Sequence, residues 1–235
     1  MSTCIITGAS DGIGKATSIE ISKSPDFQNI VIIGRNQQKL LETCKLMNTD
    51  KNIMQIIYDL EDIEGIPEMI DGIVSRFHTI NCLINVAGYT DPQSLLSMSI
   101  DSLKKTYSIN VFAPLILTRE CVKHMKYNEH GSKILNVAST AGMTPRPGWL
   151  SYASSKAALI SSSLTLADEL AEYNIKVYCI SPGRCATALR RKLAPDEDQT
   201  KIMQPEEVAR VICNLVSSEE ACLDGQNIIV RKKTR

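Results

Sequence analysis

The sequence predicts an α/β fold in which helices flank a doubly wound parallel sheet of about seven strands. Three observations predict it: short apolar runs recur along the 235 residues, the segments between them are each long enough for a helix, and the runs are apolar on both faces. Strands of this kind are typical of parallel sheets, because crossover helices cover both sides. No Pro-, Gly- or Ser-rich linker divides the chain, so we expect residues 1–235 to form one domain.

The elements follow in order along the chain. The expected strands are TCIIT, NIVIIG, NIMQIIYD, INCLIN, KILNVAS, IKVYCIS and NIIVR. Gly12 to Gly14 open the first helix, Pro25 closes the region after it, and Pro205 stands near the start of the last helix. Residues 186–204 mix an RRK cluster with PDED and show no steady periodicity. This predicts a mobile loop, which we interpret as a substrate lid.

Composition excludes several classes of function. Lys and Arg number 26 and are balanced by 26 Asp and Glu, so no net field favours nucleic acid or an anionic membrane, and we expect a small-molecule partner. No apolar stretch is long enough to span a bilayer, and the first residues lack the pattern of a secretion signal, so we expect a cytoplasmic location. The eight cysteines form no CxxC pair and the three histidines are scattered, so we expect reduced core thiols and no metal site.

A glycine-rich turn follows the first expected strand. Glycine allows the backbone to turn sharply and approach a pyrophosphate, while free N–H groups at the helix start bind anions. An ordinary βα loop is the alternative, since the spacing differs from G-x-G-x-x-G. The candidate cofactor contacts here are Gly8, Ser10, Asp11, Gly12, Ile13 and Gly14.

The second expected strand ends in Gly34-Arg35-Asn36, where doubly wound dinucleotide folds contact the adenosine ribose. An acid here would bind the ribose hydroxyls of NAD. Arg35 instead offers a permanently charged fork for a 2′-phosphate, which favours NADP(H). A solvated surface arginine is the alternative. Asp59 is a candidate acceptor for the adenine amine, or a helix N-cap.

Three residues suggest carbonyl chemistry. Ser139 follows the fifth expected strand, and Tyr152 and Lys156 lie four apart in YASSK at the start of a helix, hence on one helix face. A phenol with a pKa of about 10 is a poor proton donor or acceptor near neutrality, and a nearby ammonium would lower that pKa. We therefore expect Lys156 to lower the pKa of Tyr152. Taken alone, such a pair is more often a solvated helix face.

Together these motifs resemble the short-chain dehydrogenase/reductase family, in its single-domain, NADP-preferring branch with a Rossmann-type sheet. The resemblance covers nearly the whole chain. It rests, in order, on residues 7–14, Asp59, Asn85-Val86-Ala87-Gly88, Asn110, Ser139, Tyr152 to Lys156, and Pro182-Gly183 leading to Thr187.

The resemblance implies a role for each matching residue. Tyr152 would donate a proton to the substrate oxygen while hydride passes from the nicotinamide, and Ser139 would polarise that oxygen. Lys156 would hold the nicotinamide ribose, and Asn110 would anchor a water that links the lysine to solvent. Further contacts to NADP(H) would come from Asn36, Leu60, Asn85, Ala87, Gly88, Pro182, Gly183, Cys185 and Thr187.

Three positions depart from the family pattern. Asp11 stands where many NADP-preferring relatives carry a basic residue, which leaves Arg35 as the main 2′-phosphate contact, helped by Ser10 and Asn36. Val86 replaces an asparagine, and Cys185 stands where Val or Ile usually meets the carboxamide. None of these changes removes a catalytic group.

The substrate is not written in these motifs. We rank a general carbonyl reductase first and a 3-oxoacyl-thioester reductase second, because Arg146 and the cluster at 190–192 would suit an anionic substrate. A regulator that binds NADP(H) without turnover is a third hypothesis, which the complete catalytic set argues against. Relatives usually pair through two long helices, here about 100–125 and 151–173, so we expect a homodimer or homotetramer.

Overall fold

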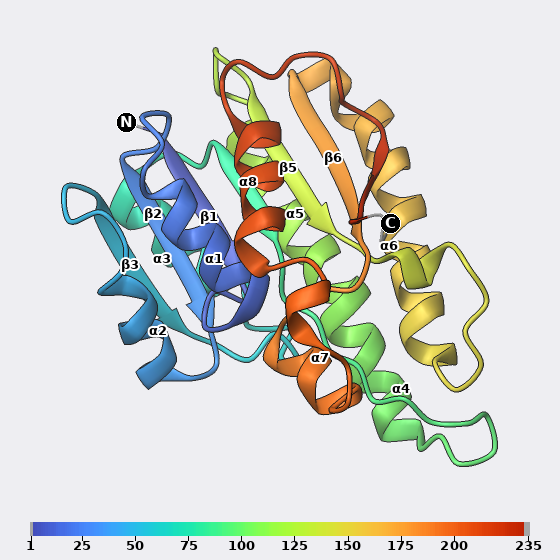
Figure 1. Ribbon diagram of the computed structural model, residues 1–235. Helices are drawn as coiled ribbons and strands as arrows, with labels where there is room; N and C mark the ends of the chain where they lie inside the picture. Colours follow the sequence, from blue (N-terminus) through green and yellow to red (C-terminus); the bar gives the residue numbers. More distant parts are fainter. Residues whose placement is uncertain (1, 233–235) are drawn as a thin grey trace.

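The computed structural model describes residues 2–232 and contains the expected parallel sheet (Figure 1). All seven strands pair in parallel, in the order β3-β2-β1-β4-β5-β6-β7. The two central neighbours β1 and β4 meet where the order reverses, and this switch point places the loops after the strands on one edge. The strands are β1 Thr3–Thr7, β2 Asn29–Gly34, β3 Asn52–Ile57, β4 Cys82–Asn85, β5 Ser132–Val137, β6 Ile175–Pro182 and β7 Asn227–Val230.

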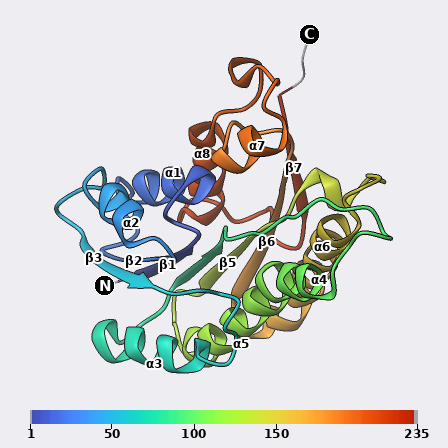
Figure 2. The ribbon, with the colours of Figure 1, turned by 90° about the horizontal axis from the view of Figure 1, so that it is seen from below.

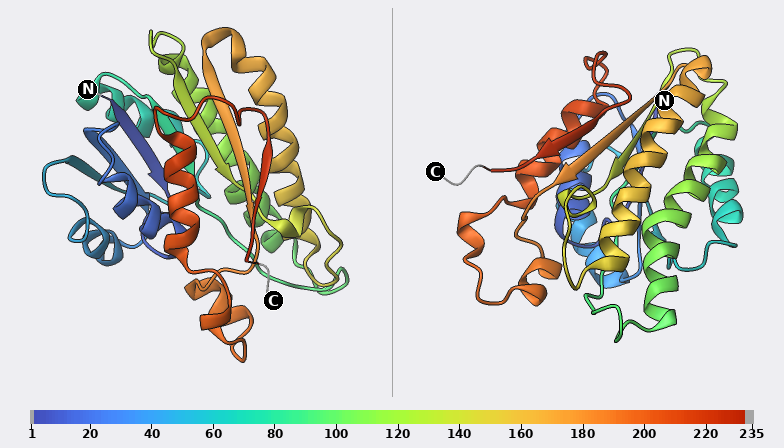
Figure 3. Two further views of the ribbon diagram at one scale, coloured as in Figure 1. Left: turned by 45° about the horizontal axis from the view of Figure 1, so that its top comes forward. Right: turned by 90° about the vertical axis from the view of Figure 1, so that its right-hand side faces the viewer.

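Helices cover both faces of the sheet (Figures 2 and 3). Helices α1, α2 and α8 lie on one face, and α3, α5 and α6 lie on the other. The short helix α7 stands at the carboxyl edge of the strands, which is where the switch-point loops also gather. The helices are α1 Gly12–Ile21, α2 Gln37–Cys44, α3 Ile66–Phe77, α4 Ile100–Tyr107, α5 Ala113–Met125, α6 Leu150–Leu170, α7 Ala188–Leu193 and α8 Pro205–Val216.

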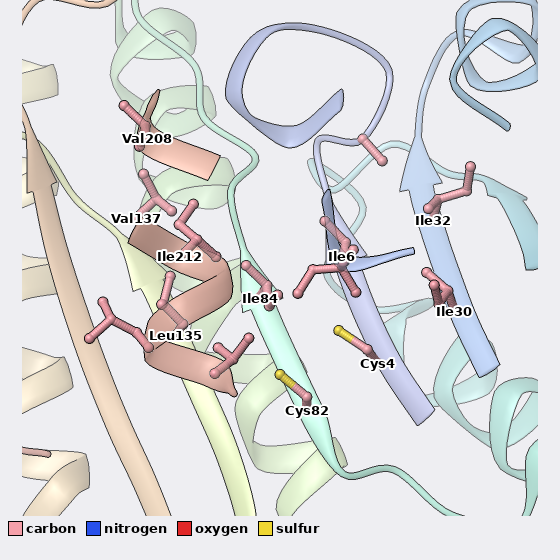
Figure 4. Close-up of a cluster of buried hydrophobic side chains, with 14 of the residues drawn as sticks. Cys4, Ile6, Ile30, Ile32, Cys82, Ile84, Leu135, Val137, Val208 and Ile212 are labelled. Atoms are coloured by element: carbon pink, nitrogen blue, oxygen red, sulfur yellow. The ribbon is translucent and has the colours of Figure 1, made fainter. Parts of the chain in front are cut away.

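The alternation of side chains along the strands divides the core into two layers. Cys4 and Ile6 of β1 face α1 and α8 together with residues of β2, β4 and β5 (Figure 4), whereas Ile5 faces α3 and α5. Successive strand residues point to opposite faces, so both neighbours must be apolar when both faces are covered. The edge strands β3 and β7 are only partly buried, as expected for strands with one neighbour.

Local chemistry explains where the first and last helices begin. The Asp11 side chain caps α1 by accepting a hydrogen bond from the Gly12 N–H. Pro205 occupies the first turn of α8, and Gln204 and Glu207 form a reciprocal capping box around it. The predicted helix starts at Gly12 and near Pro205 are therefore confirmed.

The predicted loop at 186–204 contains more regular structure than its sequence indicates. Thr187 caps α7 by accepting from the Arg190 N–H at 3.1 Å, and a 3₁₀ turn follows at Gln199–Lys201. Glu197 ties the segment together through a bidentate pair with Arg190 and a further bond from Arg184. This segment is held by polar contacts and not by a periodic apolar face, so its sequence pattern did not predict the helix. Within residues 2–232, no helix is both long and apolar enough to cross a bilayer.

Candidate active site

A cavity of about 590 Å³ opens at the carboxyl edge of the strands. It brings together loops that follow β1, β2, β3, β4, β5 and β6, which are far apart in the sequence. Most of the predicted site residues line it: Gly8, Ser10, Asp11, Gly12, Ile13, Gly14, Arg35, Asp59, Leu60, Ala87, Gly88, Ser139, Tyr152, Lys156, Pro182, Gly183, Cys185 and Thr187. Asn36, Asn85 and Asn110 are not among the lining residues.

The glycines of the first turn are required by close packing. Gly8 has a φ of +68°, and a Cβ there would lie 2.8 Å from the Ala87 backbone nitrogen. A Cβ at Gly14 would lie only 2.1 Å from the Gly8 carbonyl oxygen. Thr7 joins the same two loops, because its hydroxyl accepts from the N–H groups of Val86 and Ala87, both at 3.1 Å. Side chains at Gly8 or Gly14 would therefore collide with neighbouring backbone, so the tight turn requires glycine at both positions.

Directly after β2, Arg35 lines the cavity and forms a loose ion pair. Its Nη1 lies 3.5 Å from Asp59 Oδ2, and both side chains are about half exposed. Asp59 also accepts from the Glu61 N–H at 3.1 Å. It is not a helix N-cap, because α3 begins at Ile66, so that alternative was wrong.

Asn36 lies just outside the cavity and has a structural contact instead. Its Oδ1 accepts from the Lys39 N–H at 2.9 Å, which caps α2. Beyond it, Lys39 Nζ lies 2.5 Å from Asp11 Oδ2. We did not predict this ion pair, since the two residues are 28 positions apart and neither belongs to a pattern that joins them.

Tyr152 and Lys156 lie on the first turns of α6, as predicted. The Lys156 side chain is 3% exposed. Its ammonium donates to the Val137 carbonyl at 2.8 Å and lies 6.0 Å from the centre of the Tyr152 ring. Burial lowers the pKa of Lys156 to about 8, against a small opposing effect of Cys179. Burial thus disfavours the charged form of this lysine.

The expected lowering of the Tyr152 pKa is not found. Burial raises the pKa of Tyr152 above its ordinary value, and the weaker opposing contributions come from a hydrogen bond with Ser139 and the charge of Arg146. The Lys156 ammonium donates to the Val137 carbonyl and not to the phenol. At neutral pH the phenol is consequently protonated, which is the form that a proton donor needs.

Ser139 occupies the start of a short 3₁₀ turn, Thr140–Gly142, after β5. Its Oγ accepts from the Ala141 N–H at 3.1 Å, and the residue lines the cavity beside Tyr152. The hydroxyl hydrogen is left to point toward the phenol or a bound oxygen. Turn chemistry and a catalytic contact therefore coexist in one side chain.

Asn110 lies behind the cavity in a π-helical turn, Ser108–Phe112, between α4 and α5. Its side chain is fully buried. The carboxamide accepts from the Tyr89 N–H and donates to the Tyr89 carbonyl, both at 2.8 Å, and also reaches Ser155 at 3.0 Å. π-Helical turns often occur at functional sites, because they displace one residue from the regular helix.

Asn85 lies below the cavity at the end of β4 and is 2% exposed. Its Nδ2 donates to Asn136 Oδ1 at 2.8 Å, and Asn136 in turn donates to Ser163 of α6 at 3.0 Å. The Asn85 Oδ1 has no hydrogen-bond partner among the described residues. This network connects β4 and β5 to the helix that carries Tyr152 and Lys156.

The remaining wall follows β6. Pro182, Gly183, Cys185 and Thr187 line the cavity opposite the glycine turn, and the Thr187 methyl lies 3.0 Å from the site of a Cβ at Gly12. Burial raises the pKa of the Cys185 thiol to about 12, with a smaller contribution from Glu206. Cys185 is therefore a neutral packing group. Sequence reasoning about cofactor contacts missed further lining residues, among them Tyr58, Thr90 and Thr140.

Known proteins are similar to this chain in sequence and in fold. Residues 2–198 match the family model described as short chain dehydrogenase. A 3-oxoacyl-[acyl-carrier-protein] reductase, FabG, from Thermotoga maritima is 31% identical, over 96% of this chain and 94% of its own. A structure named "ElxO with NADP Bound" is 25% identical, with a TM-score of 0.87 over 97% of this chain and 96% of that chain.

A third relative shows the fold alone. YwfH, named an NADPH dependent reductase involved in bacilysin biosynthesis, superposes with a TM-score of 0.90 at 22% identity, over 98% of this chain and 96% of that chain. The predicted fold class is thus confirmed. The glycine turn, the Ser139, Tyr152 and Lys156 constellation and the family match agree: this chain belongs to the short-chain dehydrogenase/reductase family of oxidoreductases.

Proposed function

We propose that the protein is an NADPH-dependent reductase that converts a ketone or aldehyde to an alcohol, with Tyr152 as the proton donor. The observation that carries this proposal is the shared cavity: Ser139, Tyr152 and Lys156 open into the same space as the glycine turn. A carbonyl substrate and a dinucleotide would therefore meet within one cavity. A protonated phenol beside a hydroxyl is suited to donate a proton to an oxygen that gains charge.

The residues present fit NADP(H). Gly8, Gly12 and Gly14 line the cavity in a turn too tightly packed to accept a Cβ, and this turn leads into the N-terminus of α1, where backbone N–H groups suit a phosphate. Arg35 lines the ribose end with its guanidinium partly exposed. The relative named with NADP bound supports the choice of cofactor.

Each catalytic side chain has a separate task. When bound, NADPH supplies a hydride to the carbonyl carbon. Tyr152 donates its proton to the carbonyl oxygen, and Ser139 donates a hydrogen bond that polarises this oxygen. Lys156 would hold the nicotinamide ribose hydroxyls, and its charge would stabilise the tyrosinate left after proton transfer.

Asn110 supports this arrangement from behind. Its two bonds to Tyr89 hold the backbone that follows Gly88, whose Cβ position would be 3.6 Å from Lys156 Nζ. The water link between Lys156 and solvent, implied by the family resemblance, stays a prediction. So do the homodimeric or homotetrameric state and the cytoplasmic location.

A 3-oxoacyl-thioester reductase is the second candidate, because the substrate end of the cavity is lined with cations. Arg146 and Lys192 both line it, and within residues 2–232 neither pairs with a carboxylate. Carrier-bound thioesters bear a phosphate, which such cations would attract. The relative from Thermotoga maritima carries the corresponding name. The apolar side chains of Trp149, Leu189 and Leu193 in the same wall favour the first candidate.

The test is the oxidation of NADPH and of NADH with a panel of ketones, aldehydes, aromatic diketones and an acetoacetyl thioester. We expect turnover with NADPH in preference to NADH, and the preferred substrate distinguishes the two candidates. Preference for NADH would contradict the role of Arg35. Tight cofactor binding without turnover on any substrate would favour the NADP-binding regulator.

A further inference from the structure

The ion pair between Lys39 and Asp11 has no part in the proposed chemistry. Lys39 Nζ lies 2.5 Å from Asp11 Oδ2, with side-chain exposures of 47% and 44%. Asp11 lines the cavity next to Ser10 and Gly12, so the pair stands at the cavity rim beside the glycine turn. We call this part of the cavity, around the glycine turn and Arg35, the nucleotide end. A second ion pair, Arg35 with Asp59, lies at the same end.

The backbone holds Lys39 at this rim. Its N–H donates to Asn36 Oδ1 at 2.9 Å. This hydrogen bond fixes the first turn of α2 shortly after β2, which ends in Gly34. One turn further on, the Thr43 hydroxyl donates to the Ala9 carbonyl at 3.0 Å and fastens α2 to the glycine turn. The position of Lys39 therefore follows from the packing of the nucleotide end.

Asp11 is ionised at neutral pH. Partial burial acts to raise its pKa, but hydrogen bonds from Lys39 and the Gly12 N–H, with the charges of Lys39 and Arg191, hold the pKa below its ordinary value. The carboxylate thus neutralises Lys39 and would also repel a phosphate placed beside it.

We propose that Lys39 is a second determinant for the 2′-phosphate of NADP(H), and that Asp11 is its counterion in the absence of that phosphate. This inference rests on the proposed NADP(H) preference. Lys39 leaves the carboxylate and pairs with the phosphate, so Asp11 weakens binding while Lys39 strengthens it. Because the pair is exposed, breaking it costs little, and a phosphate of about two negative charges is the stronger partner.

Binding of 2′,5′-ADP and of 5′-AMP, measured by titration calorimetry, tests the proposal without turnover. The two probes differ by the 2′-phosphate alone. Lys39→Gln removes the charge, and we expect it to weaken 2′,5′-ADP binding about fivefold to tenfold and leave 5′-AMP unchanged. Lys39→Arg should retain most of the affinity.

Asp11→Asn should have the opposite effect. Asparagine still accepts from the Gly12 N–H, so the cap of α1 is kept while the negative charge is lost. We expect 2′,5′-ADP to bind about two- to fivefold more tightly, with 5′-AMP affected less. Lys23→Gln is the matched control. Lys23 is also an exposed lysine in an ion pair, but its partner Glu20 does not line the cavity, whereas Asp11, the partner of Lys39, does.

The outcomes separate the inference from the proposed function. Equal binding of both probes by the unmodified protein would contradict the NADP(H) preference and the inference with it. A clear preference for 2′,5′-ADP that Lys39→Gln leaves unchanged would overturn the role of Lys39 alone. Equal weakening of both probes by Lys39→Gln would likewise overturn it, because the effect would not depend on the 2′-phosphate.

Discussion

The two ends of the cavity control charge in opposite ways. At the nucleotide end, Arg35 and Lys39 are about half exposed and each is paired with a carboxylate. At the other end, around Ser139, Tyr152 and Lys156, which we call the catalytic end, Lys156 is 3% exposed. Its ammonium donates to the Val137 carbonyl and pairs with no carboxylate of the described residues. Exposed ion pairs exchange partners at little cost, whereas a buried cation is governed by desolvation. The nucleotide end is thus suited to binding an anion. The catalytic end is suited to shifting the pKa of its buried groups.

The largest expected effect comes from the catalytic end. Tyr152→Phe removes the proposed proton donor while the ring and its contact with Trp149 at 5.9 Å remain. General acid catalysis typically contributes about 10²- to 10⁴-fold. We expect kcat to fall by that factor and NADPH affinity to change little, as measured by initial rates and by fluorescence titration.

Tyr107→Phe provides the control for this variant. Tyr107 also carries a phenol on the same side of the sheet, where it donates to Ser154 Oγ at 2.9 Å, but it does not line the cavity. Its kcat should stay near that of the unmodified protein. Equal losses in both variants would indicate damage to the packing around α6 and would contradict a chemical role for Tyr152.

The next effect is the pH dependence that the buried Lys156 should give to the stability of the protein. The pKa of Lys156 is lowered to about 8 in the folded chain, against about 10.4 for an unperturbed lysine. Between these values the unfolded chain binds more protons, so this group makes the free energy of unfolding rise with pH. Below pH 8 both states are protonated and the cost of burying the charge is fully present.

Chemical denaturation of the unmodified protein and of Lys156→Met, from pH 7 to 10.5, measures this contribution. We expect the difference in unfolding free energy between the two to shift by about 3 kcal/mol in favour of the lysine as the pH rises. A flat difference for Lys156→Met would mean that desolvation does not control this end of the cavity.

The same contrast explains what the sequence could predict. The inner strands β1, β2, β4, β5 and β6 follow from their apolar runs, since burial on both faces leaves a continuous pattern. The partly buried edge strands β3 and β7 also lie where such runs were found. Tyr152 and Lys156 could be placed on one helix face from their spacing alone. These features depend on local sequence, which a pattern records directly.

Other features depend on contacts between distant segments. The pKa of Tyr152 was predicted in the wrong direction, because the sequence does not show how deeply the fold buries the phenol, and burial raises its pKa. The ion pair of Lys39 with Asp11 joins residues 28 positions apart. Asn110 was predicted as a site residue, but the sequence does not show that it lies behind the cavity. There its carboxamide is hydrogen-bonded to the backbone of Tyr89, which is 21 positions away.

The smallest effect on stability is expected at the nucleotide end. Arg35→Ala removes a cation whose partner, Asp59, lies 3.5 Å away in an exposed pair, so the free energy of unfolding should change by less than about 0.5 kcal/mol. NADPH should nevertheless bind about tenfold more weakly, with NADH unaffected, because only the former presents a 2′-phosphate to the guanidinium. Denaturation and paired NADPH and NADH titrations measure both quantities on one variant. A large loss of stability would show that Arg35 holds the fold at this end, and the contrast between an exchangeable and a buried cation would then fail.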